Sequence, residues 1–253
     1  MGMSGRARRD AILRMLGERE RLDVAELTRR LGVSGMTIRR DLAELQQDGV
    51  LRRVHGGAVR WERSPFETRR VTRAEEKRRI AERAALLVAD GDSVAIDTGT
   101  TAHCVARALR GKRDLVVVTN SIHVAGEFQG GGQESPAKVL LAGGVIAPEG
   151  CLVGALATDT IRRLHVGTLF LGCGGLTPER GFAFFDIEEA EVRRAMLEIA
   201  ERVVVVMDHT KFGRTETIAV ARLDQVDVLI TDAPPPPPYP DLCREAGVEL
   251  VIA

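Results

Sequence analysis

The chain has 253 residues, of which 44% are hydrophobic and 28% charged, a composition typical of a folded globular protein rather than a disordered or fibrous one. Its longest apolar runs are about five residues, far below the ~20 that span a bilayer, and we expect a cytoplasmic protein with no membrane partner. The net charge of zero hides an asymmetry, because residues 1–60 carry 13 arginines against 8 acidic residues and the remainder carries the opposite excess. A basic module followed by an acidic body indicates that only the first part meets phosphates.

Four cysteines are spread along the chain, at positions 104, 151, 173 and 243, without the CxxC spacing of metal sites. A chain of this length needs no disulfide framework. We therefore expect reduced structural thiols, no metal site and no bound cofactor.

The first 60 residues predict three helices and a hairpin. Apolar residues at helical spacing give two short helices, the second with Asp23 and Glu26 as a cap-like pair and Gly32 at its carboxyl end. Ser34 can cap a third helix over residues 35–48. Two short apolar runs flank Gly56 and Gly57, whose freedom to adopt positive φ suits the turn of a hairpin.

The third helix has one apolar face and one polar face. Ile38, Leu42 and Leu45 fall together and predict the side that packs on the core. A capped helix with arginines, Thr and Gln on its other side suits the DNA major groove. Taken alone, this pattern favours the solvated face of an ordinary three-helix cluster.

The wider spacing of residues favours DNA binding. Arg8, Ile12 and Leu16, followed by SGMTIRRDL at residues 34–42 and GVLRRVHGGA at residues 49–58, closely resemble the amino-terminal signature and wing of the DeoR family of bacterial transcriptional repressors. The acidic Asp41 would be repelled by phosphate, so we predict that it pairs with and orients an arginine. The predicted contacts to operator DNA are Ser34, Met36, Thr37, Arg39, Arg40 and Gln47 from the helix, and Arg52, Arg53 and His55 from the wing.

The rest of the chain predicts a parallel α/β sheet. Residues 61–73 are polar and without sustained periodicity, so we interpret them as a linker between a DNA-binding domain, residues 1–60, and a larger domain, residues 74–253. In the larger domain, near-continuous apolar strands alternate with helices, which indicates a doubly wound, mainly parallel sheet covered on both faces. The predicted strands are residues 93–97, 115–119, 138–142, 168–172, 203–207, 226–231 and 249–252.

Three predicted strands end in small, hydroxyl-rich or glycine-rich turns. DTGTT at residues 97–101 joins a strand to a helix amino terminus, whose free N–H groups and dipole suit a phosphate. TNS at residues 119–121 and AGG at residues 142–144 repeat the arrangement. Each alone can be a simple turn or helix cap, but together they indicate a ligand site at the carboxyl edge of the sheet.

These segments, with Glu189 and DHTKFG at residues 208–213, look like the sensor domain of the DeoR family. The resemblance implies a fold similar to ribose-5-phosphate isomerase and a response to phosphorylated sugars or related metabolites. It implies that residues 98–101 hold the phosphate and that Lys211 supplies a cation, although Lys211 can instead pair with Asp208. The predicted effector site comprises Asp97, Thr98, Gly99, Thr100, Thr101, Asn120, Ser121, Gly143, Gly144, Glu189 and Lys211.

The chain departs from the family pattern at two informative positions. Gly174 stands where the family commonly has Asp, which removes an acceptor for sugar hydroxyls, and Arg193 stands where Lys is usual. The apolar run at residues 183–185 would tighten the pocket.

The rival hypothesis is a sugar-phosphate isomerase fused to a DNA-binding module. Proton shuttling needs a placed carboxylate base, and no such constellation can be assembled from the sequence. The signatures of nucleotide hydrolysis, dinucleotide redox chemistry and zinc proteolysis are missing. We therefore expect a non-enzymatic repressor, released from operator DNA by a phosphorylated sugar, that forms a homo-oligomer, a dimer or tetramer, because one helix-turn-helix reads only a few base pairs.

Overall fold

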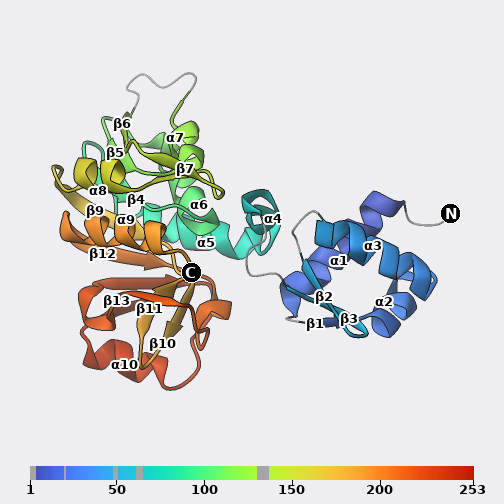
Figure 1. The fold of residues 1–253 in the computed structure, drawn as a ribbon. Helices are drawn as coiled ribbons and strands as arrows, with labels where there is room; N and C mark the ends of the chain where they lie inside the picture. The colour runs from blue at the N-terminus through green and yellow to red at the C-terminus, as the bar shows by residue number, and fades with distance from the viewer. Residues whose placement is uncertain (1–3, 20, 48–50, 61–64, 130–136) are drawn as a thin grey trace. The chain divides into compact units, whose positions relative to one another are not determined.

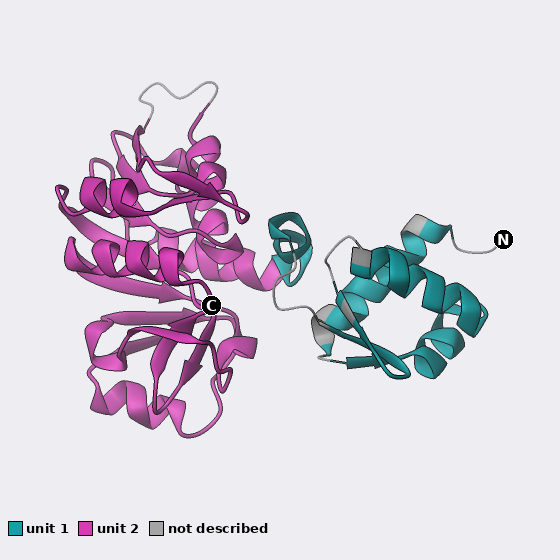
Figure 2. Cartoon of the chain, in the orientation of Figure 1, with its two compact units in different colours: residues 1–74 teal, residues 75–253 magenta. Residues whose placement is uncertain are grey.

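The structure is a computed structural model that describes residues 4–19, 21–47, 51–60, 65–129 and 137–253. The chain divides into two compact units, residues 1–74 and 75–253 (Figure 2). Of the predicted linker, residues 61–64 lie outside the described residues, and Phe66–Val71 form helix α4. This helix was not predicted, because six residues are too few for a helical period to show.

The first unit is a three-helix cluster with a three-stranded antiparallel sheet in which β3 lies between β1 and β2. Ile38, Leu42 and Leu45 are buried in its core, as the sequence predicts. Besides α4, its elements are α1 (Gly5–Glu18), β1 (Arg21–Asp23), α2 (Val24–Leu31), α3 (Gly35–Gln47), β2 (Leu51–Val54) and β3 (Gly57–Arg60) (Figure 1).

Most of the predicted helix ends are confirmed. Gly32 ends α2 with a φ of 65°, and Ser34 Oγ accepts a hydrogen bond from the Thr37 amide at 3.2 Å. The predicted pair at the start of α2 is wrong, because the Asp23 side chain makes no capping hydrogen bond. Both carboxylates form ion pairs with arginines instead: Asp23 pairs with Arg21, and Glu26 pairs with arginines at 19 and 30.

The two hairpin glycines serve different purposes. Only Gly56 has a positive φ, 78°, so the prediction of positive φ is wrong for Gly57. A side chain on Gly57 would collide with the carbonyl oxygen of Leu22 on β1. Gly57 is therefore the residue that lets β1 join the hairpin as a third strand.

The second unit contains a seven-stranded, all-parallel sheet in the order β15-β14-β12-β9-β4-β5-β6. All seven predicted strands are present in it. From β4 the chain proceeds outward to β5 and β6, and from β9 it proceeds in the other direction, so the strand order reverses between β4 and β9. The strands are β4 (Ser93–Ile96), β5 (Val116–Thr119), β6 (Lys138–Leu141), β9 (Val166–Leu171), β12 (Ala200–Val206), β14 (Val228–Thr231) and β15 (Glu249–Ile252).

Alternate residues of these strands enter two separate cores. Phe170, Val204 and Ile230 belong to a core with helices α5, α6 and α7, whereas Leu169 and Val205 belong to a core with α8, α9 and α10. This burial on both faces explains why the strands are apolar without alternation. The helices are α5 (Ala74–Ala85), α6 (Thr100–Ala108), α7 (Ile122–Glu127), α8 (Ala155–Ile161), α9 (Ile187–Glu198) and α10 (Tyr239–Glu245), with short 3-10 helices at Leu109–Gly111, His209–Lys211 and Leu223–Gln225.

Two small antiparallel sheets accompany the main one and were not predicted. A hairpin of β7 (Val145–Ala147) and β8 (Cys151–Val153) follows β6. A second sheet joins β10 (Gly175–Thr177), β11 (Gly181–Phe184) and β13 (Ile218–Ala221). Among the described residues, no helix has the length and apolar character to cross a membrane.

Candidate DNA interface and effector site

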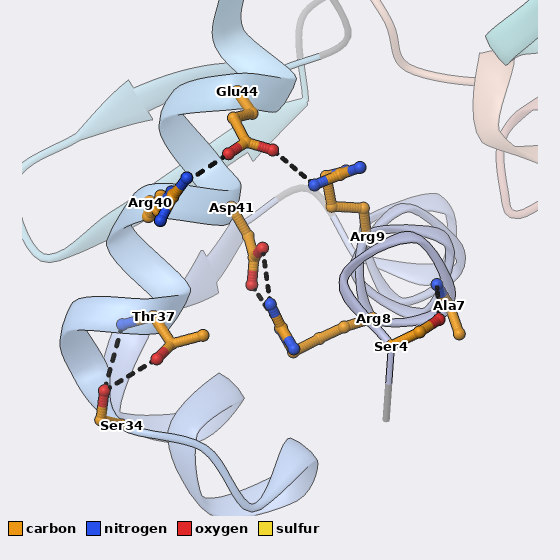
Figure 3. A network of polar contacts seen from close by, with 9 residues as sticks. All are labelled: Ser4, Ala7, Arg8, Arg9, Ser34, Thr37, Arg40, Asp41 and Glu44. Atoms are coloured by element: carbon orange, nitrogen blue, oxygen red, sulfur yellow. Dashed lines mark hydrogen bonds and ion pairs between the residues drawn. The ribbon is translucent and has the colours of Figure 1, made fainter. Parts of the chain in front are cut away.

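The outward face of α3 is basic and open. Arg39 and Arg40 are exposed, and Met36 is 72% exposed, the largest fraction for an apolar side chain on this helix. Ser34 and Thr37 share a hydrogen bond of 2.9 Å at the start of the helix (Figure 3). The face thus offers guanidinium groups for guanine or phosphate and a thioether that can contact a thymine methyl.

Two ion pairs fasten α1 to α3 behind this face (Figure 3). Arg8 Nε and Nη2 donate to the buried Asp41 carboxylate at 2.5 and 3.0 Å, and this bond raises the pKa of the Arg8 guanidinium. The predicted pairing of Asp41 with an arginine is therefore confirmed. Glu44 accepts hydrogen bonds from Arg9 of α1 and from Arg40 Nε.

The wing carries the remaining predicted DNA contacts. Arg53 and His55 are exposed on the β2–β3 hairpin, and the Arg53 amide donates to Gln46 Oε1 at 2.9 Å, which ties β2 to the end of α3. The side chains of Gln47 and Arg52 lie outside the described residues.

The DTGTT turn forms an amide cradle at the start of α6. Gly99 is the residue before the helix, with a φ of 106° that favours glycine, and it has no side chain to accept from the first helical amides. Thr100 is buried, whereas Thr101 and Gly99 are half-buried. Thr98 Oγ1 is buried and has no hydrogen-bond partner among the described residues. The turn therefore presents donors to an incoming anion.

The second predicted turn combines a helix cap with an unpaired acceptor. Ser121 Oγ accepts from the Val124 amide at 3.3 Å, so its hydroxyl caps α7. Asn120 Nδ2 donates to the Leu152 carbonyl at 3.1 Å, while the buried Asn120 Oδ1 has no partner within the part of the chain that the structure describes.

The third predicted turn differs from the other two. Gly143 and Gly144 follow β6, but they lead into the β7–β8 hairpin rather than into a helix. A side chain on Gly144 would collide with the carbonyl oxygen of Val153 on β8. The prediction of a third strand–turn–helix cradle is therefore wrong, because close packing of the hairpin accounts for this glycine.

A buried ion cluster lies where the strand order reverses. Arg193 Nε donates to Asp97 Oδ2 at 3.0 Å and Arg193 Nη2 donates to Glu189 Oε2 at 2.9 Å. Asp97 also accepts from the Gly172 amide at 3.1 Å and from the Thr98 amide at 2.7 Å. Burial raises the pKa of the Asp97 carboxyl, and the Arg193 guanidinium opposes that rise. Both Asp97 oxygens are thus engaged, so this predicted effector residue holds β4, β9 and α9 together.

Two thiols lie at the same edge of the sheet. The Cys151 thiol of β8 is buried, and burial raises its pKa to about 12. Burial also raises the pKa of Cys173 to about 12, and the nearby Lys211 pulls it the other way. Lys211 lies in the short helix that follows the carboxyl end of β12, and Asp208 caps the start of that helix through the Thr210 amide.

Packing explains the departure at Gly174. A side chain there would place its Cβ 2.6 Å from the Ala183 carbonyl oxygen and 3.1 Å from Glu216 Cγ. The loss of a carboxylate at 174 thus accompanies a close approach of β11, with the buried Glu216 beside it.

Sequence reasoning did not include Arg193 in the site. Its guanidinium lies on the ring of Phe184, with the central carbon 4.2 Å from the ring centroid. The four-residue spacing of Glu189 and Arg193 on a helix was the available signal. Its partner Asp97, however, is 96 residues away in sequence.

A chain that combines a winged helix-turn-helix unit with a parallel α/β unit is typical of a ligand-responsive DNA-binding regulator. Comparison with known proteins agrees. The DeoR-like helix-turn-helix domain model matches residues 8–64, and the DeoR C terminal sensor domain model matches residues 72–233. The chain belongs to the DeoR family of transcriptional repressors.

Individual relatives align over almost the whole chain. The glycerol-3-phosphate regulon repressor of Escherichia coli is 34% identical over 249 residues, which cover 97% of this chain and 98% of the relative. The HTH-type transcriptional repressor CsqR of Escherichia coli is 31% identical over 254 residues, with 99% and 96% covered. Among solved structures, ribose 5-phosphate isomerase A from Methanocaldococcus jannaschii is similar, with a TM-score of 0.39, 18% identity, and 55% and 54% of the two chains covered.

Proposed function

We propose that this protein is a non-enzymatic repressor that binds operator DNA through α3 and the wing, and that a phosphorylated sugar or related metabolite releases it. The observation that supports DNA binding is the exposed basic face of α3. Arg39 and Arg40 are exposed on this face, while the opposite face of the helix is buried in the core. The bond between Arg40 and Glu44 is no obstacle, because Arg40 is 83% exposed and surface pairs of this kind contribute only ~0.2–1 kcal/mol.

The effector proposal rests on the cradle at Gly99. Open amides at the amino terminus of α6 are complementary to a phosphate, and Lys211 lies at the same edge of the sheet. The name of the Escherichia coli glycerol-3-phosphate regulon repressor makes glycerol 3-phosphate the first effector to try.

The site chemistry favours a sensor over an isomerase. A base for proton abstraction needs a carboxylate that can reach the substrate, whereas Asp97 accepts three hydrogen bonds and Glu189 is paired with Arg193. A homo-oligomer is part of the proposal, because two recognition helices on paired half-sites give the specificity that one cannot.

The test is operator binding by the full-length protein, with the region upstream of its own gene as the DNA and footprinting to locate the site. If Arg39 or Arg40 contacts a base, its replacement by Ala should weaken operator binding by ~1–3 kcal/mol. If it contacts a phosphate, the replacement should weaken binding to all DNA sequences by a similar amount and reduce the salt dependence of the affinity. Arg244→Ala, on the exposed surface of the second unit, is the matched control. Unchanged operator affinity in both α3 variants would contradict the proposal.

A further inference from the structure

In the buried ion cluster, one nitrogen of the Arg193 guanidinium makes no hydrogen bond to the described residues. Nε and Nη2 of Arg193 are bonded to Asp97 and Glu189, but Nη1 has no hydrogen-bond partner anywhere in the described ranges. The side chain is only 6% exposed, and stacking on Phe184 fixes its plane. Arg193 therefore holds one nitrogen in a set direction without a protein acceptor.

Two unpaired acceptors belong to the same region. Thr98 Oγ1 and Asn120 Oδ1 are both buried without a partner, at the ends of the adjacent strands β4 and β5. The β8 strand connects Asn120 with the ion cluster, since the Leu152 amide donates to the Asn120 carbonyl at 2.8 Å and β8 packs against α9, the helix that carries Glu189 and Arg193. Thr98 follows Asp97, to which Arg193 is bonded, so these groups belong to the region where the strand order reverses, the place where open α/β sheets bind ligands. Buried polar groups in native proteins normally have partners, so the Thr98 and Asn120 oxygens can accept hydrogen bonds from a ligand.

We propose that Arg193 is a specificity-determining residue of the effector site, with Nη1 donating to a hydroxyl oxygen of the effector. Hydroxyl groups of the same ligand donate to Thr98 Oγ1 and Asn120 Oδ1. This inference rests on the proposed function and extends it. The phosphate occupies the cradle at residues 99–101, and the uncharged, hydroxylated part of the molecule occupies the Arg193 subsite.

The charges at the subsite favour hydroxyls over a second anionic group. Two carboxyl groups, Asp97 and Glu189, face one guanidinium, so a further anion there would meet net repulsion. A hydroxyl accepts from Arg193 and also donates to a neighbouring oxygen, which satisfies both kinds of unpaired atom. The effector class is therefore a polyol or sugar monophosphate with hydroxyls close to the phosphate.

A guanidinium performs this task better than an ammonium. Its planar fork holds two carboxylates with two nitrogens and directs the third elsewhere, whereas all three donors of a lysine share one atom. Arg193→Lys keeps the charge and loses the directed third nitrogen.

The experiment measures calorimetric affinity of the full-length protein for matched pairs of phosphate monoesters that differ only in hydroxyls. The pairs are glycerol 3-phosphate with propyl phosphate, and sorbitol 6-phosphate with hexyl phosphate, and inorganic phosphate tests the cradle alone. In the wild type, the polyol member of at least one pair should bind about tenfold or more tightly than its alkyl partner. Arg193→Lys should remove most of that ratio and leave the affinity for inorganic phosphate unchanged.

Two further variants keep the result interpretable. Arg194→Lys, on the neighbouring residue bonded to Glu191 and the Ala219 carbonyl, should keep the wild-type ratio. Thr98→Val removes an unpaired hydroxyl without changing side-chain shape, so it should fold even if Arg193→Lys does not, and it should also lower the ratio.

The outcomes separate the two proposals. A ratio near one in the wild type, or a wild-type ratio in Arg193→Lys or Thr98→Val, overturns the role of the subsite while phosphate binding stands. If neither inorganic phosphate nor any ester binds, the phosphate effector of the proposed function fails instead.

Discussion

The buried Cys151 thiol makes the stability of the folded protein depend on pH. Burial raises the pKa of this thiol in the folded protein to about 12, from an ordinary value near 9. An acid with a raised folded pKa keeps its proton in the folded state after the unfolded chain has lost it. Its contribution to stability is therefore complete below pH 9 and is lost as the pH rises from 9 to 12.

The expected outcome is a steeper loss of stability in alkali for the wild type than for Cys151→Ala. Between pH 8 and 11 the wild type should lose about 2 kcal/mol more of its free energy of unfolding than the variant loses. Denaturant unfolding at both pH values measures this. The cavity left by the substitution destabilises the variant equally at the two pH values and cancels in the comparison. Parallel curves for the two proteins would contradict the assignment.

Among the elements, the wing depends on one close backbone approach. Gly57 has no room for a side chain beside the Leu22 carbonyl, while Gly56 has open space and only a positive φ to satisfy. Gly57→Ala should separate β1 from β3 and lower both the free energy of unfolding and operator affinity. Gly56→Ala should cost only about 1–2 kcal/mol of stability, the strain of a left-handed alanine.

Chemical denaturation and operator titration of the two variants measure the difference. Equal effects of Gly56→Ala and Gly57→Ala would show that the approach of Leu22 is not what requires glycine at position 57.

The same elements show how far the sequence alone reaches. The seven strands of the main sheet were predictable because their apolar runs are nearly continuous, as Val203–Val206 illustrate. Strands such as β1 and β10 have three residues and take their place from tertiary pairing, so no periodicity reveals them. The turn at Gly99 depends on neighbouring residues, and α6 begins directly after it, as the sequence predicts. The bond between Asp97 and Arg193 joins distant segments, and only the folded sheet brings them together.

At the scale of the whole molecule, α3 and the Gly99 cradle belong to different compact units. We therefore expect the effector to act by preferring one arrangement of the protein over another, rather than by competing with DNA for one site. Typical coupling energies of ~1–3 kcal/mol would change operator affinity by about 5–150-fold. Linkage requires operator DNA to change effector affinity by the same factor.

Calorimetric titration of glycerol 3-phosphate into the full-length protein, with and without a saturating operator fragment, measures this reciprocity. A ligand that binds tightly but leaves operator affinity unchanged at saturation is not the regulator. If every ligand of the cradle behaves this way, the sensor role fails.

Because all strands of the main sheet are parallel, the residues of the proposed effector site lie at the carboxyl ends of the strands. The amino ends of the strands form a separate surface, to which a label can be attached. Every strand directs its carboxyl end to one edge, where Asp97, Asn120 and Gly172 lie, so the opposite edge consists of connections that enter the strands. Arg163, exposed in the turn before β9, lies at that opposite edge. A fluorophore or a surface-immobilisation tag attached there leaves the ligand edge clear, which makes the turn a practical attachment point for turning the protein into a metabolite biosensor.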